Sequence, residues 1–323
     1  MPRSASRSTK RRDGKVILCI DGGGIRGLIP ALVLAEIERT IGRPIAQSVD
    51  LIAGTSTGGI LALGLAKRGN GGKPEFSASD LADLYRSRGK EIFRRSLWQG
   101  VSSVGGVLDE QYPHDGLERV LEHYFGDQPL SDVTTRVMVA TYDIQNREPF
   151  FFKSWRRDRN AVTMRDVARA TSAAPTYFEP TVVRIGDAGR ALIDGGVFAN
   201  NPTMCAYAEI RRDSPSAEVK AISLGTGELI RPISYSEAKC WGRAQWMLPA
   251  LSCIFDGVSD SVSYQMEQIL GENFVRLQID LKLGSDDMDD ATDGNLANLT
   301  SDAKRLITTH KSDIETACAW LSK

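Results

Sequence analysis

The sequence predicts an α/β fold with a mostly parallel central sheet flanked by helices, because a strand, a glycine-rich turn and a helix occur in that order twice. A β-branched run at residues 15–20 precedes a glycine turn, and apolar residues then recur at helical spacing over 28–40. A strand at 49–53, a second glycine-rich turn at 54–59 and a helix at 60–67 follow. Tandem units of this kind place their strands in parallel and their helices on the faces of the sheet.

The rest of the chain first continues this pattern and then departs from it. Further elements are expected as strands at 136–142, 150–153, 191–193 and 219–224, with helical segments between them such as 115–124. After about Gly227 a tryptophan-rich stretch leads into a helix, a strand at 274–279 and an acidic loop. We therefore expect a basic tail at 1–14, a core at 15–227, and at 228–323 either the end of the same domain or a small regulatory subdomain.

The composition is that of an ordinary folded protein. Of 323 residues, 41% are hydrophobic and 25% are charged, and the formal net charge of -1 gives no reason to expect a nucleic-acid partner. The five cysteines lie far apart, so we expect reduced thiols in a cytoplasmic protein, most of them small core residues, and no metal site. The longest apolar run near the start, 16–20, predicts neither a secretion signal nor a membrane span.

The first fifteen residues are strongly basic. Six cations stand against the single acid Asp13: Arg3, Arg7, Lys10, Arg11, Arg12 and Lys15. A segment that cannot bury an apolar face is typical of a solvated, disordered tail. Clustered cations also gain energy near anionic lipid, so a weak membrane anchor is the alternative.

The first glycine turn satisfies the dinucleotide-binding pattern G-x-G-x-x-G through Gly22, Gly24 and Gly27. That function also needs an acidic residue at the end of the second strand to bind a ribose hydroxyl. The nearest acid, Asp50, is instead at the beginning of that strand, which ends in Ala53-Gly54-Thr55. The pattern therefore does not favour a dinucleotide, and the chain has no P-loop motif.

The second glycine turn, Gly54-Thr55-Ser56-Thr57-Gly58, matches the nucleophile motif G-x-S-x-G between a strand and a helix. Attack by a serine on an ester creates an oxyanion, which needs preorganised N–H donors nearby. The glycine turn on the neighbouring strand predicts such donors, because glycine permits close approach of the backbone. The N-terminus of the following helix adds partial positive charge.

A serine nucleophile needs a base. None of the three histidines follows a strand end in the order expected of an α/β-hydrolase; His310 is late enough in the chain to serve, but a surface or capping role is favoured for each. Asp194 ends the strand at 191–193 and begins the turn Asp194-Gly195-Gly196. A carboxylate is a weak base unless burial raises its pKa, so we expect Asp194 to be partly buried.

With these motifs in this order the chain resembles the patatin-like phospholipases. The resemblance covers about 15–227 and rests on the oxyanion element Gly22-Gly23-Gly24-Ile25-Arg26-Gly27, the nucleophile motif Gly54-Thr55-Ser56-Thr57-Gly58, the base motif Asp194-Gly195-Gly196, and the blocks at 125–126, 130–132 and 173–178. It implies a three-layer fold and a serine acyl hydrolase that needs no cofactor. Ser56 would attack an acyl ester of a membrane phospholipid and Asp194 would accept its proton. N–H groups around Gly23 and Gly24 would hold the oxyanion, while Arg26 would fix the loop or contact the lipid phosphate.

Within this family the chain is similar to the cyclic-dinucleotide-activated phospholipases of bacterial anti-phage (CBASS) signalling. That similarity implies an effector activated by 3′,3′-cGAMP or a relative, acting peripherally at the inner membrane. Trp241, Arg243 and Trp246 are candidates for stacking and phosphate contact, the alternative being core packing and solvent-facing charge. A constitutive hydrolase and a catalytically silent scaffold are the competing functions, and the sequence leaves open whether the chain forms a homo-oligomer.

Two other stretches have alternative interpretations. Residues 94–101, followed by 105–108, mix basic residues, a tryptophan and glycines, which suits a lid or interfacial contact as well as an ordinary connecting loop. The acidic run at 286–290 does not fit a calcium loop, because Ala291 stands where an oxygen ligand is needed. We expect a solvated loop leading into a helix from Ala297.

Overall fold

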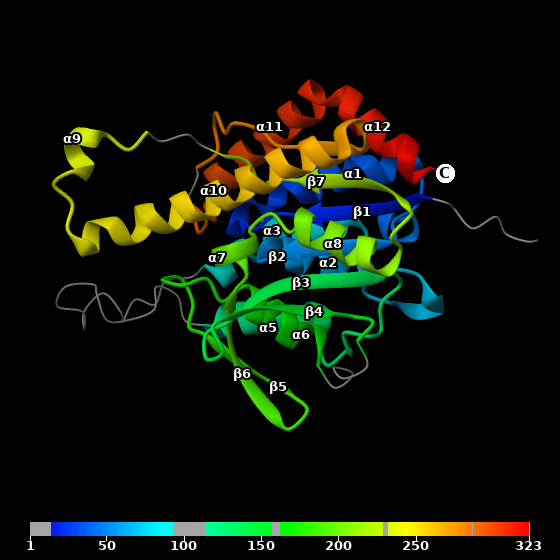
Figure 1. Cartoon of the computed structure of the whole chain (residues 1–323), viewed down its shortest axis with the longest axis horizontal. Helices are drawn as coiled ribbons and strands as arrows, with labels where there is room; N and C mark the ends of the chain where they lie inside the picture. The colour runs from blue at the N-terminus through cyan, green and yellow to red at the C-terminus, as the bar shows by residue number, and fades with distance from the viewer. Residues whose placement is uncertain (1–13, 94–113, 157–161, 229–231, 286, 323) are drawn as a thin grey trace, which may run out of the picture.

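Figure 1 shows the computed structural model of the chain, which describes residues 14–93, 114–156, 162–228, 232–285 and 287–322. The strands are β1 (Gly14–Ile20), β2 (Leu51–Thr55), β3 (Arg136–Asp143), β4 (Glu148–Lys153), β5 (Thr181–Ile185), β6 (Ala188–Asp194), β7 (Glu218–Leu224) and β8 (Phe274–Leu277). The helices are α1 (Leu28–Ile41), α2 (Thr57–Ala66), α3 (Ala78–Ile92), α5 (His114–Phe125), α6 (Met164–Thr171), α7 (Gly196–Ala199), α8 (Thr203–Asp213), α9 (Tyr235–Ala238), α10 (Arg243–Leu270), α11 (Asp293–Thr309) and α12 (Lys311–Leu321). Short 3-10 turns are η1 (Gly24–Gly27), η2 (Ile45–Gln47), η3 (Asn70–Gly72) and η5 (Gly271–Asn273).

The strands form one sheet with a parallel centre and an antiparallel side. Its order is β5-β6-β3-β2-β1-β7-β8, with β4 also paired to β3. β1 lies between β2 and β7, and the β1–β2, β1–β7, β2–β3 and β7–β8 pairs are parallel. The pairs β3–β4, β3–β6 and β5–β6 are antiparallel. The expected α/β fold with a mostly parallel central sheet is therefore confirmed.

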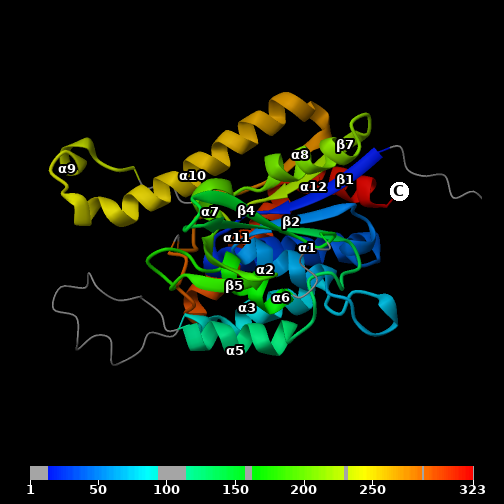
Figure 2. The same cartoon turned by 60° about the horizontal axis from the view of Figure 1, so that its bottom comes forward.

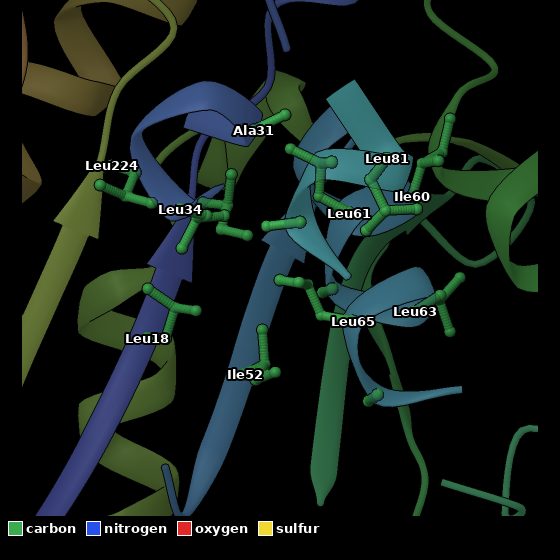
Figure 3. Packing of buried hydrophobic residues seen from close by; sticks show 14 of the residues in the cluster. Leu18, Ala31, Leu34, Ile52, Ile60, Leu61, Leu63, Leu65, Leu81 and Leu224 are labelled. Carbon is green, nitrogen blue, oxygen red and sulfur yellow. The ribbon is translucent and has the colours of Figure 1, made fainter. Parts of the chain in front are cut away.

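Helices cover both faces of the sheet, and the side chains of β1 show why. Val16, Leu18 and Ile20 belong to the larger core, which also holds side chains of α1, α2 and α3. Figure 3 shows Leu18 of β1 in this core with Leu34 of α1, Leu61 of α2 and Leu81 of α3. Ile17 and Cys19 point into a second core against α8 and α10. Figure 2 shows the sheet between these two helical layers. A strand covered on both faces reads as an unbroken apolar run, which explains the continuous sequence at 16–20.

Most predicted elements are present, with shifted ends. β2 begins at Leu51 rather than 49, and β5 was not predicted. η3 lies within the stretch at 69–73. Helix α11 begins at Asp293, four residues before the expected Ala297, because the Thr292 side chain accepts a hydrogen bond from the Asn295 N–H and caps the helix.

The last part of the chain adds to both sides of this sheet. β8 extends the sheet beside β7, and α11 and α12 lie against α1. α10 crosses the opposite face and touches α7 and α8 with its C-terminal half, while its N-terminal half and α9 project beyond the rest of the molecule (Figures 1 and 2). Among the described residues, no helix has the length and apolar character needed to cross a bilayer.

Candidate active site

The register of the sheet brings the three glycine motifs to one edge. Ile20, the last residue of β1, pairs with Gly54 of β2, and Thr55 then pairs with Ala140 of β3. The next residue of β3 pairs with Asp194, the last residue of β6. The glycine loop that follows β1, the Ser56 turn that follows β2 and the Asp194 turn that follows β6 therefore lie close together.

Ser56 occupies a strained turn between β2 and α2. Its backbone has φ 55° and ψ -126°, in a region that side-chain-bearing residues rarely adopt. The Ser56 N–H donates to Thr171 Oγ1 at 2.8 Å, and Thr171 Oγ1 donates to the Ala140 carbonyl at 2.7 Å. The Ser56 carbonyl accepts the Gly59 N–H at 2.8 Å. These bonds hold the sharp turn and so fix the backbone from which the serine side chain projects.

The glycines on either side of Ser56 are required by backbone packing. A Cβ on Gly54 would lie 2.1 Å from the Gly58 carbonyl oxygen, and one on Gly58 would lie 2.1 Å from the Ile20 carbonyl oxygen. Real Cβ atoms do not come this close to backbone atoms. The two glycines therefore let the start of α2 pack directly on β1 and β2.

Asp194 is a buried carboxylate that contacts the serine. The residue is 2% exposed, and its carboxylate accepts the Gly196 N–H at 2.8 Å. Burial raises the pKa of Asp194 to about 7, although hydrogen bonds from the Ser56 hydroxyl and the Gly196 N–H oppose the rise. A Cβ on Gly195 would lie 2.5 Å from Ala140 backbone atoms, so this glycine lets the turn pass close to β3. The expected burial of Asp194 is present.

The glycine loop after β1 is held by its own hydrogen bonds. The Gly22 N–H donates to the Asn200 carbonyl at 3.1 Å, and the Arg26 N–H donates to the Gly23 carbonyl at 3.2 Å. The Arg26 guanidinium donates to the carbonyls of Gly23 at 3.3 Å and Gly227 at 3.1 Å. Gly22 and Arg26 were both expected in the oxyanion element. Their N–H groups are already engaged, so these residues shape the loop, and of the two roles foreseen for Arg26 the contacts fit the fixing of the loop.

Gly23 and Gly24 differ from the rest of that loop. Within the described residues, no hydrogen-bond acceptor is recorded for either N–H group, and both residues line the same pocket as Ser56. Gly27 contacts α2 instead. A Cβ at this position would lie 2.2 Å from Thr57 Oγ1, so the absence of a side chain lets η1 pack closely against α2. Gly23 and Gly24 are the members of the loop that can face a bound group.

The pocket above Ser56 and Asp194 is mainly apolar. Its cavity volume is about 50 Å³, so in this conformation it is smaller than ligand pockets, which span about 300–1,000 Å³. Its apolar walls come from several helices and loops: Ile60, Ile92, Phe93, Leu117, Tyr177, Phe178 and Phe255. Apolar side chains therefore make up most of the wall beside Ser56 and Asp194, which suits a ligand with an apolar part.

Four residues at this site were not foreseen from the sequence. Asn200 Nδ2 donates to Ser259 Oγ of α10 at 3.0 Å, while the backbone carbonyl of Asn200 accepts the hydrogen bond from the Gly22 N–H. Met288 accepts the Ile25 N–H at 2.8 Å and lines the pocket, so the loop expected to be solvated packs on the glycine loop. Thr171 lies two residues before the family block at 173–178, so its position beside that block could have suggested a place near the site. Phe255 carries no sequence signal for a pocket.

Other sequence candidates lie elsewhere. His310 caps α11 and pairs with Asp313 at 2.9 Å, which agrees with the favoured capping role, and His123 lies beside Tyr124 on α5. Neither lines the pocket. Asp50 is bound to Lys15 at 2.8 Å, at the start of β2 and away from the glycine loop.

Further expectations concern surface residues and metals. Two of the five cysteines, Cys240 and Cys253, are exposed, which departs from the expected core positions. Trp241 and Trp246 pack edge to face, 5.1 Å between ring centroids, and Trp246 is exposed, so core packing does not describe it. Among the described residues there is no cluster that could hold a metal ion. The suggested lid at 94–101 and 105–108 and the basic tail fall outside the described residues.

A model of the family described as patatin-like phospholipase matches residues 18–207, which include the glycine loop, Ser56 and Asp194. The chain belongs to the patatin-like phospholipase family. Patatin-like protein 4 of Arabidopsis thaliana is 31% identical over 91% of this chain and 83% of that protein. The cGAMP-activated phospholipase of Pseudomonas aeruginosa is 33% identical over 85% of this chain and 80% of that protein. A crystal structure of VipD from Legionella pneumophila aligns with 92% of this chain and 67% of that chain, at 12% identity and a TM-score of 0.45.

Family membership gives the class of reaction. This patatin-like phospholipase is a lipid acyl hydrolase, as the sequence resemblance implied.

Proposed function

We propose that this enzyme cleaves fatty-acyl esters of membrane phospholipids with Ser56 as nucleophile and Asp194 as its only base. The observation that carries the proposal is the hydrogen bond from the Ser56 hydroxyl to a buried carboxylate whose pKa is raised to about 7. A carboxylate with that pKa is a far better proton acceptor than an exposed one, and it matches the pH at which the enzyme would work. The competing scaffold function predicts no such pairing.

In the acylation step, Ser56 Oγ attacks the carbonyl carbon of the ester as Asp194 takes the hydroxyl proton. The oxyanion that forms accepts hydrogen bonds from the N–H groups of Gly23 and Gly24, and the N-terminus of α2 adds favourable potential. The bond between the carbonyl carbon and the leaving oxygen then breaks. Asp194 returns its proton to that oxygen, so the alcohol leaves neutral and the acyl group stays on Ser56.

Deacylation repeats the sequence with water. Asp194 takes a proton from the attacking water, the second oxyanion forms on the same donors, and its collapse releases the fatty acid. The proton held by Asp194 passes to Ser56 Oγ and the starting state is restored. The cycle uses no metal and no cofactor.

The dyad is tested by release of fatty acid from phospholipid vesicles. We expect Ser56→Ala and Asp194→Asn to lose at least about 10³-fold in rate, because the two groups act as a unit. A fluorophosphonate probe should label the wild type and Ser172→Ala, whose hydroxyl also lines the pocket, but not Ser56→Ala. Undiminished hydrolysis by both dyad variants would refute the mechanism.

We also propose that a cyclic dinucleotide such as 3′,3′-cGAMP activates the enzyme in anti-phage defence, at the cytoplasmic face of the inner membrane. The support is its similarity to the cGAMP-activated phospholipase of Pseudomonas aeruginosa over most of both chains. Running the vesicle assay with and without 3′,3′-cGAMP separates this regulation from a constitutive hydrolase. Equal rates in both arms would remove the activator and leave the dyad intact.

A further inference from the structure

The segment at 233–254, called the α9–α10 arm below, exposes large apolar side chains. Trp246 is 40% exposed, Met247 52% and Ile254 46%, and Tyr235 of α9 is 82% exposed. The arm projects from the rest of the molecule, so these side chains are not covered by the sheet or its helices (Figure 1). Large apolar side chains gathered on one projecting element mark an interaction site rather than the scattered exposure of an ordinary surface.

The charge pattern of the arm differs from that of the rest of α10. Residues 239–255 contain two cations, Lys239 and Arg243, and no acidic residue, whereas Asp256 and Asp260 follow at once. Aromatic and aliphatic side chains flanked by cations, without acids, are typical of helices that lie in the interface of a bilayer. Glu237 of α9 is the only acid in the arm sequence and stands against Lys239 and Arg243, so the arm has a net charge of +1 and is not repelled by anionic lipid headgroups.

The arm is continuous with the wall of the active-site pocket. Phe255, directly after Ile254, is buried and lines the pocket that holds Ser56 and Asp194. One turn further along α10, Ser259 accepts a hydrogen bond from Asn200 beside the glycine loop. Nine residues of α-helix separate Trp246 from Phe255, which is about 14 Å along the axis. A surface bound by the arm would therefore lie next to the pocket.

We propose that the α9–α10 arm binds the surface of a phospholipid bilayer and so places the pocket against the layer from which its substrate comes. This inference rests on the proposed function, since it is the lipid substrate that makes a bilayer the expected partner. Trp246, Met247 and Ile254 enter the headgroup and upper acyl region, and Arg243 pairs with lipid phosphate. The apolar wall that begins at Phe255 then gives an acyl chain a continuous apolar path from the bilayer to Ser56.

Binding is measured with full-length protein carrying Ser56→Ala, so that the vesicles stay intact during the experiment. The arm variant combines Trp246→Ser, Met247→Ser and Ile254→Ser. The matched control combines Tyr264→Ser, Ile269→Ser and Leu283→Ser, because these side chains are as exposed but lie outside the arm. On vesicles of phosphatidylcholine and phosphatidylglycerol, we expect the arm variant to bind about tenfold or more weakly than Ser56→Ala alone, since it loses three apolar contacts. The control should bind normally.

Activity measurements separate this inference from the proposed function. For these measurements both variants carry the natural Ser56. The arm variant should then lose hydrolysis of vesicle lipid but keep hydrolysis of a soluble short-chain ester, whereas the control variant should keep both activities. The inference would be overturned if the arm variant bound vesicles as tightly as Ser56→Ala alone. It would also be overturned if the control variant lost as much vesicle binding as the arm variant. A third contrary result would come from light scattering, if it showed that the protein forms a dimer without lipid and that the arm substitutions dissociate this dimer. A second copy of the chain would then cover the arm. If the wild type hydrolyses neither ester nor lipid, whether or not 3′,3′-cGAMP is present, the proposed function fails while vesicle binding by Ser56→Ala remains a separate result.

Discussion

Asp194 is the residue whose ionisation most strongly links structure to activity. In the proposed mechanism it must be charged to take the proton of Ser56, yet burial raises its pKa to about 7. The fraction of enzyme in the active form therefore rises with pH through that value. We expect kcat/KM on a soluble ester to have an ascending limb with a midpoint near pH 7, because this ratio reports the ionisation of the free enzyme. A rate already at its maximum at pH 5 would contradict it.

The same ionisation has the opposite effect on stability. Because the folded pKa of Asp194 lies above the ordinary value of 3.8, folded protein holds a proton that unfolded protein has released between these two values. The free energy of unfolding contributed by this group is therefore greatest below about pH 4 and falls as the pH rises to about 7. Asp194→Asn cannot titrate. Comparing urea unfolding of wild type and Asp194→Asn from pH 5 to 8 should show the wild type losing stability relative to the variant.

At the scale of elements, the contact between β1, β2 and α2 depends on glycine. A Cβ on Gly58 would lie 2.1 Å from the Ile20 carbonyl oxygen, a backbone atom of the central strand that cannot move freely. We expect Gly58→Ala to lower the free energy of unfolding by about 1–3 kcal/mol, as overpacking does, and to lower activity through displacement of the Ser56 turn. Chemical denaturation and ester hydrolysis measure the two effects.

Gly257 is the matched control for that substitution. It lies within α10, and a Cβ there would meet no atom within 4 Å. Gly257→Ala is expected to raise the free energy of unfolding by up to about 1 kcal/mol, because alanine favours the helix more than glycine does. If both substitutions had the same effect on stability, the packing argument for Gly58 would be wrong.

The sequence predicted best the elements whose signal is local. The glycine loop and the Ser56 turn each follow a strand directly, so their meeting at one edge of the sheet follows from the parallel pairing of β1 and β2. The Asp194 turn reaches the same edge differently, because β6 runs antiparallel to β3 and pairs only with its last three residues, a register that the sequence did not show. The contributions of Asn200, Met288 and Phe255 were not predicted, because each depends on a contact between segments distant in the chain. The sequence likewise indicated a helix before the strand at 274–279, but not that one half of this helix would remain uncovered.

At the scale of the whole molecule, the C-terminal part contacts the glycine loop and the residue before it. Arg276 of β8 donates to Asp21 at 2.6 Å and to Ser223 of β7 at 2.8 Å. Asp21 immediately precedes the glycine loop and is 2% exposed. Burial raises the pKa of Asp21, and the Arg276 guanidinium opposes that rise. A residue beyond 227 thus compensates a buried acid beside Gly22.

This contact predicts that the part at 228–323 supports the stability of the core. Arg276→Met keeps an apolar side chain in place but leaves Asp21 without its cation, and removing one partner of a buried pair costs about 3–5 kcal/mol. Lys15→Met is the matched control, because the Lys15–Asp50 pair is 34% and 27% exposed and such pairs contribute at most about 1 kcal/mol. Adding Asp21→Asn to Arg276→Met should recover part of the loss, since the buried charge is then gone. Urea unfolding followed by circular dichroism measures all four proteins. Equal losses for Arg276→Met and Lys15→Met would show that the core is stable without this link, which is the behaviour expected of a separate regulatory subdomain.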